Sequence, residues 1–301
     1  MRLAAVDIGS NTVHALVADV AGDGLLEDVA HYVEMPQPAA QVGRSGEIGP
    51  RKRKQTVVAL RNVVGRAREH GYEALVAGAT AAVRKAGDRE RLLAEASDAI
   101  GVPVRIIDEK REAELSFAGV AMRHSRKGEW LMADLGGGSL ELVPAEGRRM
   151  KAWASLELGS GSYADRFLSD PPVDGERARL REAALQVMRR SPEADPEQVV
   201  VTGGTASNLT IVVSRGKPPE VLDQQALLTA EERLDAAAAS QVARRLGLPG
   251  ARVKALRGGV EILLLLMDWY GVHRLHISHQ GLRHGMLLAY LERGADWAEA
   301  R

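Results

Sequence analysis

The sequence predicts an α/β fold made of two related halves. Three short apolar stretches typical of antiparallel strands open the chain, and helical and strand patterns then alternate. The pattern at the start of the chain is repeated near its middle: Asp7 and Asp134 each end an apolar run, and each precedes a glycine-containing turn. The length of 301 residues accommodates two domains of the usual size, about 100 to 200 residues each.

The first half is expected to begin with a β-meander, in which strands near 3–8, 13–20 and 27–35 pair with one another. Hydrophobic periodicity then predicts alternating helices and strands. The helices are expected near 50–71, 88–100 and 109–122, and the strands near 74–77 and 102–107. This order of elements predicts one α/β domain over residues 1–122.

The second half is expected to repeat this plan over residues 123–284. Its strands are predicted near 130–133, 140–143, 151–158, 198–201 and 273–278, and its helices near 162–168, 174–189 and 282–291, with a further helix after Thr205. Thr229 and Glu232 have the spacing of a capping box, which predicts that another helix begins at Thr229.

Composition excludes several classes of protein. Lys plus Arg and Asp plus Glu both total 40, so no net charge favours nucleic acid or a membrane surface, and the aromatic content of 4% argues against base stacking. The absence of cysteine excludes disulfides, thiolate zinc sites and a cysteine nucleophile. The longest later apolar run, 262–267, is far shorter than the about 20 residues of a membrane span. We therefore expect a cytoplasmic protein that binds neither nucleic acid nor membranes.

A neutral chain can hold a polyanion only through a local basic patch. The run Arg51-Lys52-Arg53-Lys54 is such a patch, at the start of an expected helix. Cations at this position oppose the helix dipole, and a solvated helix N-terminus is the simpler interpretation of the run.

Two glycine-containing turns between strands are candidate phosphate-binding loops. Glycine lets main-chain N–H groups approach an anion closely, because it has no Cβ and admits positive φ. The candidate residues are Gly9, Ser10 and Asn11 in the first half and Gly136, Gly137, Gly138 and Ser139 in the second. A tight hairpin is the structural alternative for each turn taken alone.

The carboxylates beside these turns are candidate magnesium ligands. Mg²⁺ prefers carboxylate oxygens together with water and substrate phosphates. Asp7 and Asp134 precede the two turns, and Glu141 lies seven residues after Asp134, where a hairpin can fold it back toward the same place. A joint site of Asp7, Asp134 and Glu141 requires the two halves to face each other.

Six motifs follow one another along nearly the whole chain. They are Asp7-Ile8-Gly9-Ser10-Asn11-Thr12, Thr80-Ala81-Ala82-Val83-Arg84, Glu112-Ala113-Glu114-Leu115, Asp134 to Glu141, Gly203-Gly204-Thr205 and Gly281-Leu282-Arg283-His284-Gly285. In this order they resemble the exopolyphosphatase and guanosine pentaphosphate phosphohydrolase family, Ppx/GppA, in its short two-domain form. The resemblance implies two ribonuclease-H-like domains of the actin-like ATPase superfamily, with an active-site cleft between them and a last segment, 285–301, that packs back on the first.

The resemblance also implies an activity, which is hydrolysis of the terminal phosphoanhydride bond of inorganic polyphosphate to release orthophosphate. It implies that Glu112 activates or orients the attacking water and that Arg84 binds phosphate, together with the two turns and with Gly204 and Thr205. A divalent metal, Mg²⁺ or Mn²⁺, and a homodimer are implied as well. Without the resemblance, the simpler interpretation is that Glu112 is part of a solvated helix face and that Arg84 is a surface cation.

Several alternatives remain open at the level of the sequence. Guanosine pentaphosphate carries the same kind of terminal bond, and no residue separates the two substrates. An actin-like ATPase or sugar kinase shares the Asp-Leu-Gly-Gly-Gly-Ser turn, and a catalytically silent alarmone sensor would share the binding residues. The chain departs from the family at Asp108-Glu109, where Ser-Gly is usual, which predicts a changed loop before Glu112.

Overall fold

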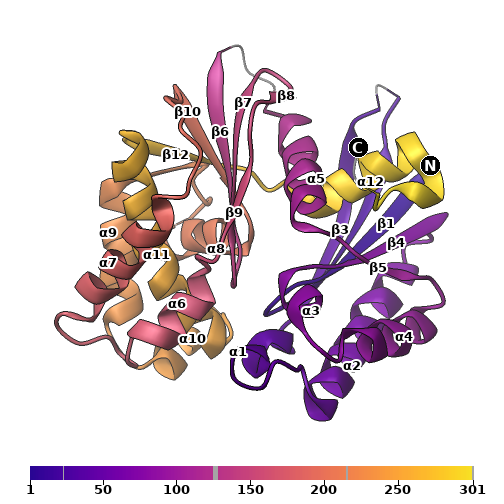
Figure 1. Ribbon diagram of the computed structural model, residues 1–301, viewed down its shortest axis with the longest axis horizontal. Helices are drawn as coiled ribbons and strands as arrows, with labels where there is room; N and C mark the ends of the chain where they lie inside the picture. Colours follow the sequence, from indigo (N-terminus) through magenta and orange to yellow (C-terminus); the bar gives the residue numbers. More distant parts are fainter. Residues whose placement is uncertain (23, 125–127, 215, 300–301) are drawn as a thin grey trace. The chain divides into compact units, whose positions relative to one another are not determined.

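The computed structural model describes residues 1–22, 24–124, 128–214 and 216–299, and the chain divides into two compact units. Unit 1 comprises Met1–Arg123 and Gln280–Arg301, and unit 2 comprises His124–His279. Each unit has its own sheet and its own helices (Figure 1), so the predicted mixed α/β fold is confirmed. Within the described residues, no helix combines the length and apolar character that crossing a membrane requires.

Unit 1 is built on a five-stranded sheet with the order β3-β2-β1-β4-β5. The strands are β1 (Arg2–Ile8), β2 (Val13–Val20), β3 (Leu26–Glu34), β4 (Ala74–Ala79) and β5 (Val104–Ile106). The first three are antiparallel, whereas β4 and β5 run parallel to β1. Strand β1 lies in the middle of the sheet with both faces covered, so almost all of its residues are apolar and buried. Most residues of the edge strand β3 are exposed or partly exposed.

Alternate residues of β1 belong to two different cores. Ala4 and Val6 pack with Leu60 of helix α2, and Leu3 packs with Leu115 of helix α5 on the other face. The helical elements of unit 1 are η1 (Pro38–Ala40), α1 (Val42–Ser45), α2 (Pro50–Arg68), α3 (Ala81–Lys85), α4 (Arg89–Ile100), α5 (Glu109–Ala121), α12 (Leu282–Arg293) and η2 (Gly294–Asp296).

Helix α12 packs directly against α5, although the two are far apart in sequence (Figure 1). A Cβ built on Gly285 would lie 1.8 Å from the carbonyl oxygen of Leu115, and one built on Gly119 would lie 2.1 Å from that of Gly281. Only glycine permits this close approach of two helix backbones. The helix ends at Arg293, and residues 300–301 of the expected last segment lie outside the described residues.

Unit 2 has a seven-stranded sheet with the order β11-β12-β10-β6-β7-β8, with β9 also paired to β7. The strands are β6 (Glu129–Leu135), β7 (Leu140–Glu146), β8 (Arg149–Met150), β9 (Ala154–Leu156), β10 (Gln198–Thr202), β11 (Val221–Asp223) and β12 (Arg274–Ile277). The strand expected over 151–158 is shorter than predicted, because only β9 forms within that range; β8 lies before it, and each of the two pairs separately with β7.

Six helices complete unit 2 and share one hydrophobic core with its sheet. They are α6 (Ser160–Phe167), α7 (Glu176–Met188), α8 (Gly204–Val213), α9 (Gln224–Asp235), α10 (Ala239–Leu246) and α11 (Gly250–Tyr270). The capping box predicted at Thr229 is wrong, since α9 begins five residues earlier and Thr229 lies in its interior. Asp223, the last residue of β11, caps the helix instead, because its carboxylate accepts from the N–H of Ala226 at 2.8 Å.

The two sheets repeat one plan, as the sequence predicted. β1 pairs antiparallel with β2 and parallel with β4, and β6 pairs antiparallel with β7 and parallel with β10. In both units the turn after the first strand is closed by the same bond, from Gly9 N–H to Thr12 O (2.9 Å) and from Gly136 N–H to Ser139 O (3.0 Å).

Candidate active site

The turn after β1 is held in shape by a neighbouring loop. The carbonyls of Ser10 and Asn11 accept hydrogen bonds from the backbone N–H groups of Ala39 and Gln37, at 2.9 and 3.0 Å. Within the described part of the chain, the N–H groups of Ser10 and Asn11 donate no hydrogen bond. The turn can therefore offer two fixed donors to an anion.

Asp7 lies beside this turn, at the C-terminal end of β1. Its side chain is largely buried, and Nη1 of Arg283, in the first turn of α12, lies 3.9 Å from its Oδ2. A cation at this distance favours the ionised form of a carboxylate. Sequence reasoning quoted Arg283 only as part of a motif, and the structure gives it this electrostatic role.

Arg84 and Glu112 form a buried ion pair in unit 1. Arg84 is in the short helix α3, and Glu112 is in the first turn of α5. Nη1 of Arg84 donates to Oε2 of Glu112 at 2.9 Å and to the carbonyl of Ile107 at 2.7 Å. Glu112 is only 8% exposed, so it does not belong to a solvated helix face. The two residues that the sequence singled out for this half lie in contact.

The departure at Asp108-Glu109 has a defined local structure. Oδ1 of Asp108 accepts from the N–H of Arg111 at 2.8 Å and so caps α5. Oε1 of Glu109 lies 3.4 Å from Nη2 of Arg84. Two carboxylates therefore share the Arg84 guanidinium, which reduces the positive charge that Arg84 presents to a phosphate.

The turn after β6 rests on the N-terminus of α6. Both the N–H and the hydroxyl of Ser160 donate to the carbonyl of Gly136, at 3.0 and 3.1 Å. A Cβ built on Gly159 would lie 2.3 Å from the Cα of Gly138, so the two loops touch backbone to backbone. Within the described residues, the N–H groups of Gly137 and Gly138 donate no hydrogen bond. Like the N–H groups of the first turn, they can donate to an anion.

Four polar residues form a row across the sheet of unit 2, next to this turn. Asp134 is the register partner of Glu141 on β7 and of Thr202 on β10, and Glu141 is in turn opposite Ser155 on β9. Directly paired residues point to the same face of a sheet, so the two carboxylates are neighbours. Oγ of Ser155 donates to Oε1 of Glu141 at 2.9 Å, which orients the buried Glu141 side chain.

The donors of this row fit a divalent cation such as Mg²⁺. They are all oxygens, and Mg²⁺ takes one or two carboxylates while keeping water and phosphate as its other ligands. Within the described residues, no group of three or more His, Cys, Asp or Glu side chains could hold a metal ion by itself. Asp134 and Glu141 are thus a carboxylate pair of the kind that Mg²⁺ takes, and the third predicted ligand, Asp7, belongs to unit 1.

The turn between β10 and α8 passes directly against Asp134. Gly203 has φ 96°, and a Cβ there would lie 2.8 Å from Oδ1 of Asp134, so only glycine fits. Thr205 is buried in the first turn of α8, and its Oγ1 lies 2.9 Å from Oγ of Ser160. Its hydroxyl therefore braces the loop that carries the Gly136 turn. The sequence motifs did not mark Ser160, although the small-residue stretch around it was a usable signal.

Arg252 is a cation that the sequence did not reveal. It lies in the first turn of α11, and a Cβ built on Gly204 would lie 3.2 Å from its Nη1. Its side chain has no hydrogen-bond or ion-pair partner within the described residues, and burial lowers the pKa of its guanidinium. Nothing in the surrounding helical pattern distinguished this arginine from an ordinary surface cation. A positive charge without a counter-ion thus lies beside the predicted phosphate residue Gly204.

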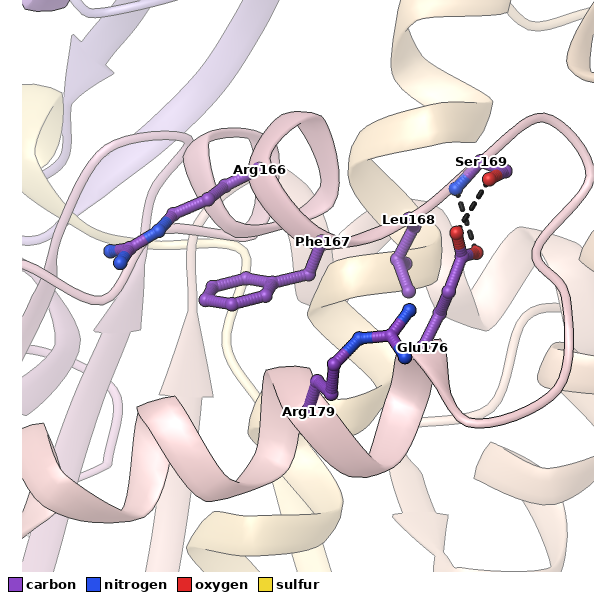
Figure 2. A pocket seen from close by; sticks show the side chains of 6 residues that line it. All are labelled: Arg166, Phe167, Leu168, Ser169, Glu176 and Arg179. Carbon is purple, nitrogen blue, oxygen red and sulfur yellow. Dashed lines mark hydrogen bonds between the residues drawn. The ribbon is translucent and has the colours of Figure 1, made fainter.

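A separate cavity of about 310 Å³ opens in unit 2 and contains none of the predicted site residues. It is lined by Arg166, Phe167, Leu168, Ser169, Glu176 and Arg179, and the Phe167 ring lies between the two arginines (Figure 2). Hydrogen bonds from Ser169 and from Val173 lower the pKa of Glu176 to about 2. Its carboxylate stays ionised, and this negative charge in the lining opposes an anionic ligand.

Comparison with known proteins identifies the family. The model of the Ppx/GppA phosphatase family matches residues 16–294. An uncharacterized protein of Streptomyces coelicolor is 30% identical over 314 residues, which cover 99% of this chain and 92% of that protein. The Ppx/GppA enzyme of Aquifex aeolicus is 25% identical with a TM-score of 0.78, covering 96% of this chain and 99% of that chain.

An exopolyphosphatase of Cytophaga hutchinsonii, 21% identical, has the same fold with a TM-score of 0.87, covering 97% of this chain and 98% of that chain. The fold is therefore that of the two-domain actin-like ATPase type, as expected from the sequence. Because the family model spans nearly the whole sequence, the chain belongs to the Ppx/GppA phosphatase family.

Proposed function

We propose that this protein is an exopolyphosphatase, which hydrolyses the terminal phosphoanhydride bond of inorganic polyphosphate and releases orthophosphate. The observation that carries the proposal is the buried pair of Arg84 and Glu112, 2.9 Å apart, in a member of the Ppx/GppA phosphatase family. Phosphoanhydride hydrolysis needs a group that positions water and a cation that neutralises the phosphoryl oxygens. A carboxylate and a guanidinium held side by side supply both.

In this mechanism Glu112 accepts a hydrogen bond from the attacking water. The water oxygen bonds to the terminal phosphorus while the bridging P–O bond breaks, and the shortened chain leaves with the electron pair of that bond. The proton of the water passes to the Glu112 carboxylate and then to solvent. Arg84 neutralises the phosphoryl oxygens, and its bond to the Ile107 carbonyl keeps its guanidinium in place.

Unit 2 contributes donors for phosphate oxygens. The N–H groups of Gly137 and Gly138 and the guanidinium of Arg252 are proposed to bind them. Asp134 and Glu141 would hold Mg²⁺ or Mn²⁺, which when bound spreads the negative charge of the phosphates. The desolvated, unneutralised Arg252 supports an anionic ligand here, because a half-buried cation without a partner is costly.

Phosphate release in the presence of Mg²⁺ tests the proposal, with long-chain polyphosphate, guanosine pentaphosphate and ATP measured in parallel. Glu112→Gln keeps the shape of the side chain and removes its basicity, so we expect kcat to fall at least about 100-fold. The control is Glu114→Gln on the same helix, whose carboxylate contacts Lys110 and Arg111 instead of Arg84. Full turnover by a folded Glu112→Gln variant would exclude the mechanism.

The same measurement decides between substrates. A higher kcat/KM for guanosine pentaphosphate than for polyphosphate would make the alarmone the physiological substrate, since its terminal bond requires the same groups. ATP-dependent phosphorylation of a sugar would indicate a kinase. Tight binding of guanosine tetraphosphate with no turnover of any compound would indicate a sensor.

A further inference from the structure

A cavity of about 710 Å³ lies in unit 1, between the end of β3 and the first turns of α2. Its volume is within the range of about 300–1,000 Å³ that is usual for ligand sites. Residues 34–37 form one wall, and side chains of α2 from Arg51 to Ala59 form the other. The basic run of the sequence therefore borders a concave site, with the side chains of Arg51 and Lys54 exposed at its edge.

Three of the four cations of that run line the cavity, namely Arg51, Lys52 and Lys54. The fourth, Arg53, turns the other way and is buried in an ion pair with Asp88 at 2.6 Å. Among the described residues, Arg51 and Lys54 have no hydrogen-bond or ion-pair partner. The run thus divides into one structural arginine and three cations that face a shared space.

The positive charge of the cavity is not neutralised by the fold. Glu34 is the single acidic residue in the described lining, and its Oε1 accepts from Nδ2 of Asn62 at 2.9 Å. Helix α2 has no acidic residue in its first turn, and the carboxylate at its start, Asp88, accepts from the N–H groups of Ile48 and Gly49 and is paired with Arg53. Burial and the charge of Arg51 lower the pKa of Lys52. Such crowding of cations is unfavourable unless an anion occupies the space.

One wall of the cavity is hydrogen-bonded to the first glycine turn. The N–H of Gln37, in the cavity wall, donates to the carbonyl of Asn11 at 3.0 Å, and the N–H of Ala39 donates to that of Ser10 at 2.9 Å. Gln37 has φ 55°, and it is the one non-glycine residue with positive φ in the described part of the chain. A strained backbone of this kind persists where the surroundings require it, often beside a ligand.

We propose that this cavity is an oligophosphate subsite, in which Arg51, Lys52 and Lys54 hold internal phosphates of a polyphosphate chain bound at the Gly9–Asn11 turn. The inference rests on the proposed function and names the substrate class within it. The described lining contains no aromatic side chain on which a base could stack. The cavity therefore recognises repeated negative charge, which favours inorganic polyphosphate over a guanosine nucleotide.

The test compares chain lengths in a double variant, Arg51→Ala/Lys54→Ala, which removes two exposed cations that have no partner to lose. We expect its ratio of kcat/KM for long-chain polyphosphate to kcat/KM for tripolyphosphate to fall about tenfold relative to wild type, because each exposed ion pair contributes a few-fold. Arg61→Ala is the matched control, since Arg61 is exposed on the same helix and lies outside the cavity. An unchanged ratio, or an equal fall in Arg61→Ala, would overturn the proposal.

A binding measurement separates failure of the subsite from failure of the proposed function. Fluorescently labelled long-chain polyphosphate is titrated with three proteins that all carry Glu112→Gln to suppress turnover: this variant alone, and its combinations with the double substitution and with Arg61→Ala. Weaker binding by about tenfold in the double variant alone, with a flatter salt dependence, supports the subsite even if no polyphosphate is hydrolysed. Equal binding by all three proteins contradicts it, whatever the activity assay shows.

Discussion

At Arg84 a single guanidinium serves three acceptors, and this competition bears on catalysis. It donates to the carboxylate of Glu112 and to the carbonyl of Ile107, and Glu109 approaches it at 3.4 Å. A phosphoryl group that binds Arg84 must displace or share these contacts. The half-exposed Glu109 is the contact most easily given up, because solvent can replace it, so substrate binding need not separate Arg84 from Glu112.

Arg252 is the residue whose environment most directly predicts a substitution effect. We expect Arg252→Leu to raise KM for polyphosphate about tenfold or more, because a charge-assisted hydrogen bond to phosphate is lost. The melting temperature of this variant should not fall, since the side chain of Arg252 has no partner within the described residues. Steady-state kinetics and a thermal melt check both parts. A lower melting temperature with unchanged KM would instead assign Arg252 a structural role.

Glu231 is expected to make stability depend on pH. It lies in α9 beside Arg177 at 3.5 Å, and burial, with repulsion from Glu261 and Asp235, raises its pKa from 4.5 to about 7. Between these two values the folded protein holds a proton that the unfolded chain releases, so this contribution to stability falls as pH rises through that window.

Glu231→Gln imitates the protonated carboxyl at every pH. The variant should therefore melt at a higher temperature than wild type at pH 8, and the difference should shrink toward pH 5. Glu232→Gln, an exposed neighbour on the same helix, is the control. Parallel pH profiles for wild type and Glu231→Gln would show that the pKa of Glu231 is not raised.

At the scale of elements, the contact between α5 and α12 depends on glycine. A methyl group at Gly285 would meet the backbone carbonyl of Leu115 at 1.8 Å, and backbone cannot rotate away as a side chain can. We expect Gly285→Ala to lower the free energy of unfolding by about 2 kcal/mol or more, measured by urea denaturation. The comparison is Gly65→Ala in α2, where no atom lies within 4 Å of the new Cβ.

Gly65→Ala should stabilise the protein by about 0.5–1 kcal/mol, because alanine loses less backbone entropy than glycine in a helix. The opposite signs of the two substitutions would identify packing as the cause at Gly285. Equal stabilities for Gly285→Ala and wild type would mean that α12 can move away from α5 at little cost.

At the scale of the whole molecule, one structural plan occurs twice, with different residues at equivalent positions. The partner of Asp7 across its hairpin is His14, whereas the partner of Asp134 is Glu141. Two neighbouring carboxylates suit a divalent cation, and an aspartate beside a histidine and Arg283 suits it less. The repeat therefore accounts for a metal-binding role proposed for unit 2 and a water-positioning role proposed for unit 1.

Net charge also acts at this scale. The chain carries 40 basic and 40 acidic residues, so no long-range field attracts a polyanion. The proposed binding of polyphosphate therefore requires places where cations gather without counter-ions, and Arg252 and the cavity of Arg51, Lys52 and Lys54 are two such places among the described residues.

Most elements were predictable, because hydrophobic periodicity and glycine turns are local properties of a chain. The strands 13–20 and 74–79 and the helices 50–68 and 89–100 lie within a few residues of their expected positions. Two predictions failed for equally local reasons. Asp223 provided a better cap than Thr229, and only residues 154–156 of the stretch 151–158 pair with β7 as a strand.

The sequence by itself determined the two-fold plan, the family and the glycine turns, since each depends on residue order alone. Only the tertiary structure decided what surrounds each charge. It buried Glu112 against Arg84, and it left Arg252, which no motif marked, without a counter-ion among the described residues. It also divided one basic run into Arg53, paired with Asp88, and three cations around a cavity. Burial and ion pairing depend on segments far apart in the chain, and no local pattern encodes them.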